Sequence, residues 1–397
     1  MARELKEILT LGNKGSSRRA AAAHASRLAG PLSGLYLSQL IPALLLVVIG
    51  VITIWSASIS IPEANFVSHL AGIAIGLVVA VLVWRYDMRA LSSMTTALFV
   101  LACILMVLPR IPGLGYEVNG MMGWVRLGPV RFQPSEPSKI VVIFLMASAA
   151  AQYNGKIETF KDYARLCGTL LVPLLLIMTL DLGTGLVIFF IGATIIIVSG
   201  APRTWVLLTI ALIVGVAAVV IITSMIDGLP HILKEYQLNR LIVFVNPDVD
   251  PTNNGYNLTQ AMIAVGSGGF FGKGFGNATQ ALNGFVPEAQ TDFVFSLFAE
   301  QFGFVGSLVL LSLFTWMIVS TVLLAMKTES MYMRLILVGC VGMWTFQVLE
   351  NVGMCLGIMP ITGIPLPFVS YGSSSMVVQL VSVGIVQSVW RHRQKAA

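Results

Sequence analysis

The sequence predicts an all-α, polytopic membrane protein with about ten transmembrane helices and a long extracytoplasmic loop between spans 7 and 8. The 397 residues are 56% hydrophobic and only 11% charged, with a mean hydropathy of +0.86. A soluble domain carries about 25% charged residues, so the composition excludes that class. The apolar runs are roughly 20 residues long, which suits membrane helices, whereas barrel strands are shorter and alternate in polarity.

Ten apolar runs follow one another along the chain. A basic, Ala- and Ser-rich segment at residues 1–34 precedes them and has no signal-peptide core, so we expect a cytoplasmic tail. The runs lie at 37–58, 64–85, 89–109, 135–152, 164–181, 183–200, 203–225, 293–326, 332–357 and 367–390. The membrane domain is therefore expected at 35–391, with a short tail at 392–397. The count of ten depends on a real break near residues 181–184.

The basic residues orient these spans. An even number of spans places both termini on one side, and seventeen of the 24 Lys and Arg residues then lie on that side. Because cytoplasmic loops are rich in Lys and Arg, we expect both termini in the cytoplasm. The net charge of +6 is spread over span ends and tails, which argues against a nucleic-acid-binding patch.

Two outer segments, at about 110–134 and 226–292, are too long to be simple connections. The second contains the amphipathic stretch Ile232–Phe244 and a Gly-rich stretch at 266–277. The Gly-rich stretch lacks the spacing of a nucleotide-binding P-loop. It is either a flexible re-entrant turn or a backbone nest in which Lys273 faces a pyrophosphate.

Asp292 stands where the second outer segment re-enters the membrane. A carboxylate at that edge is energetically costly, so it indicates a functional site. Asp292, Ser296 and Glu300 are spaced i, i+4 and i+8, and we expect them to share one helix face that points into the bundle or a cleft. The alternative for Asp292 is an N-cap of the eighth helix.

Other polar residues lie at or within the spans. Glu136 and Lys139, three residues apart, can pair on the first turn of the fourth span, although a capped helix start is the alternative. Asp181 is either a helix cap or a site acid. Glu350 is either paired inside the bundle or lines a cavity. Four scattered cysteines and four histidines show no metal-binding spacing.

The segment Pro360–Ser375 contains three prolines and several hydroxyl side chains, which predicts a rigid turn followed by a helix with hydroxyls at its start. Together with the segments above, it resembles the SEDS family (shape, elongation, division and sporulation), over residues 35–390. The motifs that carry the resemblance are Gly123-Trp124, Arg126-Leu127-Gly128, Phe132–Glu136, Asp181–Thr184, Asn246-Pro247, Gly255-Tyr256, Pro287-Glu288, Thr291-Asp292-Phe293 and Pro365–Ser375.

Gly272–Asn277 and Thr362–Phe368 are more similar to the RodA branch than to the FtsW branch. Leu180, Gln301 and Ser373 depart from residues common in the family. The resemblance implies a peptidoglycan glycosyltransferase that polymerises lipid II at the outer face of the bacterial cytoplasmic membrane, for cell elongation and shape. It also implies a class B penicillin-binding protein as partner.

The resemblance assigns roles to individual residues. Asp292 matches the family's catalytic aspartate and would be the general base. Glu136 would orient Lys139, and cations would offset the charge of the departing pyrophosphate, with help from a divalent ion such as Mg or Mn and no organic cofactor. The further substrate-binding residues expected are Arg126, Lys273, Ser296, Glu300, Asp181, Ser370 and Ser374.

Two rival functions remain for the sequence. A lipid II flippase could use intramembrane acids such as Asp181 and Glu350. A non-catalytic scaffold could instead recruit a cell-wall synthase. The acids and bases concentrate on the outer side, which favours the enzyme.

Overall fold

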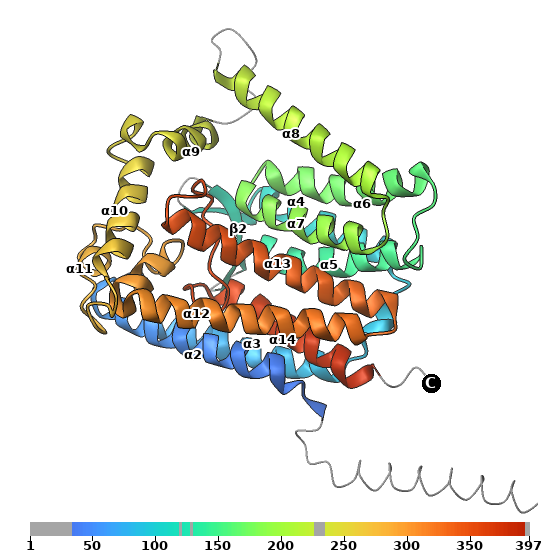
Figure 1. Cartoon of the computed structure of the whole chain (residues 1–397), viewed down its shortest axis with the longest axis horizontal. Coiled ribbons are helices and arrows are strands. Elements are labelled where there is room, and N and C mark those ends of the chain that lie inside the picture. Colours follow the sequence, from blue (N-terminus) through green and yellow to red (C-terminus); the bar gives the residue numbers. More distant parts are fainter. Residues whose placement is uncertain (1–33, 119–120, 128–129, 226–234, 394–397) are drawn as a thin grey trace, which may run out of the picture.

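A computed structural model describes residues 34–118, 121–127, 130–225 and 235–393 (Figure 1). Each of the ten expected apolar runs contains a helix there, although residues 367–372 of the tenth run form a turn before its helix, and the fold is the expected helical membrane protein. The ten helices are α2 (Leu37–Ser60), α3 (Phe66–Arg85), α4 (Thr95–Val107), α5 (Ser135–Ala151), α6 (Phe160–Met178), α7 (Leu182–Val198), α8 (Arg203–Met225), α12 (Val294–Lys327), α13 (Met331–Cys355) and α14 (Ser373–His392).

Six of these helices are long and apolar enough to cross a membrane, namely α2, α3, α8, α12, α13 and α14. Helices α4 and α7 are shorter apolar helices. Two 3-10 helices, η2 (Met88–Leu91) and η3 (Leu108–Arg110), flank α4. Most of the tail predicted at 1–34 and most of that at 392–397 lie outside the described residues.

The break between the fifth and sixth spans is real. Helix α6 ends at Met178, and Asp181 is the N-cap of α7. Its carboxylate accepts hydrogen bonds from the Thr184 backbone N–H at 3.0 Å and from the Thr184 hydroxyl at 2.6 Å. The cap interpretation of Asp181 is therefore confirmed.

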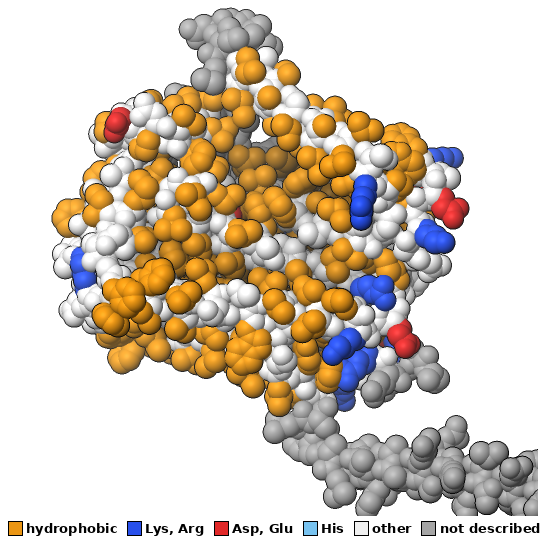
Figure 2. All heavy atoms as spheres, viewed as in Figure 1, with side chains coloured by type: hydrophobic (Ala, Val, Ile, Leu, Met, Phe, Trp, Pro, Cys, Tyr) orange, Lys and Arg blue, Asp and Glu red, His pale blue; other side chains and the backbone are white. Residues whose placement is uncertain are grey.

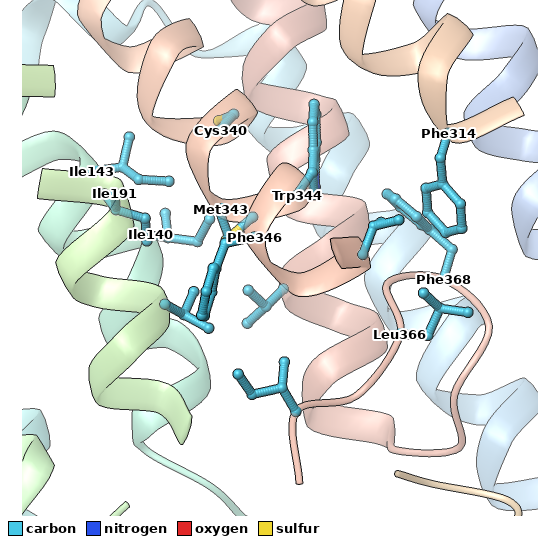
Figure 3. Packing of buried hydrophobic residues seen from close by; sticks show 14 of the residues in the cluster. Ile140, Ile143, Ile191, Phe314, Cys340, Met343, Trp344, Phe346, Leu366 and Phe368 are labelled. Atoms are coloured by element: carbon cyan, nitrogen blue, oxygen red, sulfur yellow. The ribbon is translucent and has the colours of Figure 1, made fainter. Parts of the chain in front are cut away.

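Helix α13 lies at the centre of the bundle. On one side Ile140 and Ile143 of α5 and Ile191 of α7 pack near it, as Figure 3 shows. On the other side the buried Trp344 indole donates to Gln379 Oε1 at 3.0 Å, and the Gln379 amide donates to Gln347 at 3.0 Å. These buried amides tie α13 to α14, because breaking either bond would leave a polar group unpaired in an apolar interior.

Helices α3 and α14 pack closely along their length. A Cβ at Gly72 would lie 2.9 Å from the Ser373 Cα, and one at Gly76 would lie 3.1 Å from the Val377 Cα. Glycines at this interface allow the two backbones to approach, as small residues do between membrane helices.

The remaining elements gather at one end of the bundle, which we call the loop end (Figure 1). A three-stranded antiparallel sheet forms the first outer segment, with β1 (Gly115–Val118), β2 (Met121–Leu127) and β3 (Val130–Phe132). The all-α prediction missed this sheet. Strands of three to seven residues between turns give too short a period-two pattern to recognise.

The second outer segment contains α9 (Glu235–Val245), η4 (Pro247–Val249), α10 (Asn254–Ser267) and α11 (Thr279–Leu282). Helix α9 confirms most of the expected amphipathic stretch, whose first residues lie outside the described ranges. Asp250 joins α9 to α10: its carboxylate accepts from the Asn239 side chain at 2.8 Å and from the Asn254 backbone N–H at 3.2 Å.

Helix α12 is interrupted at Gly303, where φ is 66° and ψ is −163°. The Gly-rich segment closes this break. Lys273 and Gly274 donate their N–H groups to the carbonyls of residues 300 and 301, both at 2.9 Å. In return, the N–H groups of residues 304 and 305 donate to the carbonyls of residues 269 and 270. The segment is thus an ordered turn that satisfies backbone groups which lipid could not.

Helix α8 diverges from the bundle towards the loop end (Figure 1), and none of its apolar stretch is buried. It contacts α6 near its start, where the Tyr163 and Thr209 hydroxyls lie 2.7 Å apart. Figure 2 shows that hydrophobic side chains cover most of this face and that the surface is hollowed between α8 and the bundle.

The first prediction concerns the break in α12. A Cβ at residue 303 would lie 2.3 Å from the Gly272 nitrogen, and φ is positive there. We expect Gly303→Ala to lower the free energy of unfolding by roughly 2–4 kcal/mol, from backbone strain and overpacking. Thermal unfolding in detergent measures this. Gly215→Ala in α8 is the matched control, because a Cβ there meets nothing within 4 Å, and it should not destabilise the chain; equal losses would contradict the interpretation.

Candidate active site

Asp292 lies in the turn immediately before α12, at the loop end of the bundle, and is half-buried. The helix begins at Val294, and its N-cap position is Phe293, without a side-chain cap. The N-cap interpretation of Asp292 is therefore wrong. Within the described residues its carboxylate makes no hydrogen bond or ion pair, so both oxygens remain available to a ligand.

The backbone around Asp292 is held from two elements. The Asn351 side chain of α13 donates to the Asp292 carbonyl at 2.7 Å and to the Ile364 carbonyl at 2.8 Å. The Ser370 hydroxyl donates to the Thr291 carbonyl at 2.6 Å, and the Tyr371 N–H donates to the Gln290 carbonyl at 2.8 Å. We call the segment Pro360–Gly372 the clamp turn, since it fixes the chain that carries Asp292.

Ser370 was predicted to bind substrate. It is buried, and its hydroxyl also accepts the Leu366 N–H at 2.8 Å. Both of these bonds lie within the clamp turn or between it and residue 291. The structure therefore gives Ser370 a positioning role.

The clamp turn also touches the Asp292 side chain. Gly363 has φ of 76°, and a Cβ there would lie 3.0 Å from Asp292 Oδ2. A Cβ at Gly183 would lie 2.8 Å from the Thr362 carbonyl oxygen and 3.4 Å from Asp181 Oδ1. The start of α7 and the Asp292 carboxylate therefore meet at the same two residues, 362 and 363.

Charged groups from four elements surround this point. The Thr362 hydroxyl donates to Glu350 Oε1 of α13, and Arg240 of α9 donates to the Thr362 carbonyl at 3.3 Å. Asp292 interacts electrostatically with Arg240, Glu288, Asp181 and Glu350. One carboxylate oxygen of Glu350 is therefore paired with Thr362, while Oε2 is buried without a hydrogen-bond partner among the described residues.

The protonation of Asp292 follows from these surroundings. Burial, and after it the negative charge of Glu288, raise the pKa of Asp292 to about 7, while Arg240 opposes the shift and Asp181 adds to it. A carboxyl group that titrates near neutral pH can both take and release a proton.

Sequence reasoning missed several of these residues. Arg240 belongs to the amphipathic stretch Ile232–Phe244, and only its tertiary contact with Thr362 brings it to the site. Asn351 and Thr362 act through backbone carbonyls, which no sequence pattern reveals.

Glu136 and Lys139 form the expected pair on the first turn of α5, with Lys139 Nζ 2.7 Å from Glu136 Oε1 and both side chains buried. Glu136 Oε2 and the Ser135 hydroxyl are buried without a hydrogen-bond partner among the described residues. Such unpaired groups are rare in a mere helix start. Within the part of the chain that the structure describes, this pair makes no hydrogen bond or ion pair with Asp292.

The predicted stripe of Asp292, Ser296 and Glu300 is wrong for Glu300. Glu300 is fully buried and points to the Gly-rich segment, where it accepts from Lys273 Nζ at 2.6 Å and from the N–H groups of Gln280 and Ala281 at 2.9 and 3.1 Å. Lys273 also donates to the Thr279 hydroxyl. Both charges are thus used to hold α11 against α12, because a buried carboxylate requires donors.

Three further predicted site residues are Ser296, Arg126 and Ser374. Ser296 is buried one turn after Asp292, and the Cys355 side chain of α13 interacts both with Ser296 and with the charge of Asp292. Arg126 is exposed on β2, and Ser374 is half-exposed on the first turn of α14. Among the described residues, no group of three or more His, Cys, Asp or Glu side chains could hold a metal ion.

Comparison with known proteins supports one family. Residues 37–395 match the family of FtsW, RodA and SpoVE, described as a cell cycle protein. The peptidoglycan glycosyltransferase MrdB of Escherichia coli K12 is 33% identical over 361 residues, which cover 90% of this chain and 94% of that protein.

Solved structures agree in fold. A chain from a study titled "Structural coordination of polymerization and crosslinking by a peptidoglycan synthase complex" is 28% identical, with a TM-score of 0.77, covering 91% of this chain and 99% of that chain. The rod shape determining protein RodA of Thermus thermophilus is 27% identical, with a TM-score of 0.65, covering 91% of this chain and 98% of that chain.

The second prediction concerns the Glu300–Lys273 pair. Replacing Glu300 by Gln leaves the Lys273 ammonium without its counter-charge and weakens the bonds to the start of α11. We expect a loss of roughly 1–3 kcal/mol in the free energy of unfolding, measured by thermal unfolding. Glu329→Gln, at an exposed acid between α12 and α13, is the matched control and should change little. An unchanged Glu300→Gln protein would show that the pair does not hold α11.

Proposed function

The chain belongs to the FtsW, RodA and SpoVE family of cell cycle proteins, and we propose that its Asp292 carboxylate is the general base in the polymerisation of lipid II. The protein is a peptidoglycan glycosyltransferase built on membrane helices. The observation that carries the role of Asp292 is a carboxylate without a hydrogen-bond partner among the described residues, on a segment whose backbone is fixed at the loop end. Burial raises the pKa of this carboxyl group to about 7.

In the proposed reaction, Asp292 removes the proton from the 4-hydroxyl group of the acceptor sugar. The hydroxyl oxygen attacks the anomeric carbon of the donor, and the bond from that carbon to the lipid diphosphate breaks. A base whose pKa lies near the working pH is efficient, because it is ionised before the transfer and still basic enough to accept the proton. General base catalysis of this kind contributes roughly 10²–10⁴-fold.

The departing diphosphate needs nearby positive charge. Arg240 lies in the charge cluster around Asp292, so we assign it to this task together with Lys139, which Glu136 orients. Lys273, a candidate from sequence, is engaged by Glu300 and Thr279. Arg126 and Ser296 keep their proposed role in substrate binding.

A divalent cation such as Mg or Mn is also proposed, but the described residues form no metal site of their own. Such an ion would take most of its ligands from the substrate phosphates, as Mg²⁺ does in other phosphate-binding enzymes.

The membrane setting matches lipid-linked substrates. The hollow between α8 and the bundle (Figure 2) is bordered by the helix whose apolar stretch is exposed, and we propose that lipid-linked substrates enter there. We propose the bacterial cytoplasmic membrane as its location, with both termini in the cytoplasm and the loop end outside. A class B penicillin-binding protein is the proposed partner, and elongation the proposed process; the solved synthase complex named above supports such a partnership.

The third prediction tests the base. Purified chain with its partner, lipid II and a divalent cation should produce glycan strands, and Asp292→Asn should reduce the rate by roughly 10²–10⁴-fold with unchanged thermal stability. Asp248→Asn, at an exposed carboxylate in the same outer segment, should retain the wild-type rate. Full activity of Asp292→Asn would remove Asp292 from the mechanism.

The fourth prediction concerns pH. Because the base acts ionised, polymerisation should rise with pH through a midpoint at about 7. Arg240→Gln removes a charge that favours the carboxylate, so the midpoint should move to higher pH; Glu288→Gln removes a repelling charge, so it should move to lower pH. Initial rates measured from about pH 5 to 9 test this. Shifts of both variants in the same direction would contradict the assignment.

The same pKa has the opposite effect on stability. The folded chain binds the Asp292 proton more tightly than the unfolded chain, whose ordinary value is 3.8. This group therefore lowers stability progressively as the pH rises from about 4 to about 7, while activity rises.

A further inference from the structure

The first turn of α14 follows directly after the clamp turn and carries a run of hydroxyl side chains. Helix α14 begins with Ser373, Ser374 and Ser375. Its N-cap is Gly372, which has no side chain to cap the helix, and no acidic residue lies in the first turn. The first N–H groups of a helix have no partner within the helix, and they carry the positive end of its dipole.

Hydroxyl groups add to these donors. The Ser373 hydroxyl is used between helices, donating to the Ser68 carbonyl at 3.1 Å and contacting the Ser68 hydroxyl at 3.2 Å. The Ser374 and Ser375 side chains are half-exposed, and within the described residues they make no hydrogen bond. Two hydroxyls and the adjacent N–H groups therefore form an uncapped set of neutral donors.

His69 provides an independent observation. It lies on the side of α3 that faces this turn, next to Ser68, and its ring is 6.1 Å from the ring of Tyr371. The side chain is fully buried, and neither ring nitrogen has a hydrogen-bond partner among the described residues. Buried polar groups are normally paired, so two unused nitrogens indicate that a polar ligand completes the site.

The position of this turn relates it to the reaction. Tyr371 and Ser370, just before the helix, donate to the carbonyls of residues 290 and 291. The first turn of α14 is thus attached, through two hydrogen bonds, to the segment that carries Asp292. The Asp292 carboxylate and these donors have a fixed relation, as a base and a leaving-group site require.

We propose that the first turn of α14, with His69 at its side, binds a phosphate group of the polyprenyl diphosphate carried by the substrates. Helix N-termini with hydroxyl side chains bind phosphate through N–H and O–H donors without a cation. This inference rests on the proposed function and deepens it. It assigns the phosphate to α14, in addition to the counter-charges Arg240 and Lys139.

Ser374→Asp separates binding from folding. An acid in the first helical turn interacts favourably with the helix dipole, so the fold should be retained or stabilised. The same charge repels a phosphate. The full chain is placed in phosphatidylcholine nanodiscs, and geranylgeranyl diphosphate is titrated while the unfolding temperature is followed. We expect the apparent affinity to fall by roughly tenfold or more in Ser374→Asp.

Two controls sharpen this result. Thr252→Asp adds the same charge in an exposed turn at the loop end and should bind as wild type does. His69→Gln should weaken the binding of geranylgeranyl diphosphate several-fold, because the proposal places the imidazole at the side of the phosphate site. Unchanged affinity in Ser374→Asp, with an intact fold, would overturn the proposal, as would an equal loss in Thr252→Asp.

A further experiment distinguishes a diphosphate ligand from a phospholipid headgroup. Phosphatidylglycerol added to the nanodiscs should stabilise wild type and Ser374→Asp equally; a stabilisation lost only in Ser374→Asp would assign the site to a phospholipid headgroup and overturn the diphosphate assignment.

Asp292→Asn should still bind the probe without making strands. If Ser374→Asp binds normally while Asp292→Asn is inactive, this inference fails and the proposed function stands. Strand synthesis by Asp292→Asn would instead defeat the proposed function.

Discussion

The hydrogen bonds that fix the peptide chain on either side of Asp292 are the interaction on which the site depends. Asn351 reaches the Asp292 carbonyl from α13, and Ser370 and Tyr371 reach the two preceding carbonyls from the clamp turn. Because these bonds go to backbone oxygens, the carboxylate itself stays unengaged. A helix of the core and a rigid turn therefore position the carboxylate while its oxygens make no hydrogen bond of their own. Preorganised sites of this kind reduce the cost of reaching the transition state.

The second constraint is the need of every backbone group for a partner where water is absent. Gly303 interrupts α12, and the Gly-rich segment pairs with the carbonyls and N–H groups that the interruption exposes. The ion pair between the Glu300 and Lys273 side chains then holds the same segment. The glycine run therefore has a structural explanation that a nucleotide-binding motif would not supply.

Sequence reasoning predicted the helical class, the ten apolar runs, the break at Asp181 and the Glu136–Lys139 pair, because apolar periodicity and i,i+3 spacing are local properties. It could not predict the sheet at residues 115–132, whose strands are too short to show alternation. It also misplaced Glu300, since the interruption at Gly303 and the packing of a distant segment decide where that carboxylate points. Arg240 and Thr362 join the site only through tertiary contacts, so nothing in their own neighbourhood identified them.

The exposed helix α8 has a consequence for how the protein responds to its surroundings. A helix that packs on its neighbours only near its start, where Trp205 lies against Phe160 and Tyr163, loses little protein packing when the rest of it tilts or swings. Its orientation is then set mainly by the match between its hydrophobic length and the thickness of the bilayer. The width of the hollow between α8 and the bundle should therefore vary with the fatty-acid chain length of the host membrane.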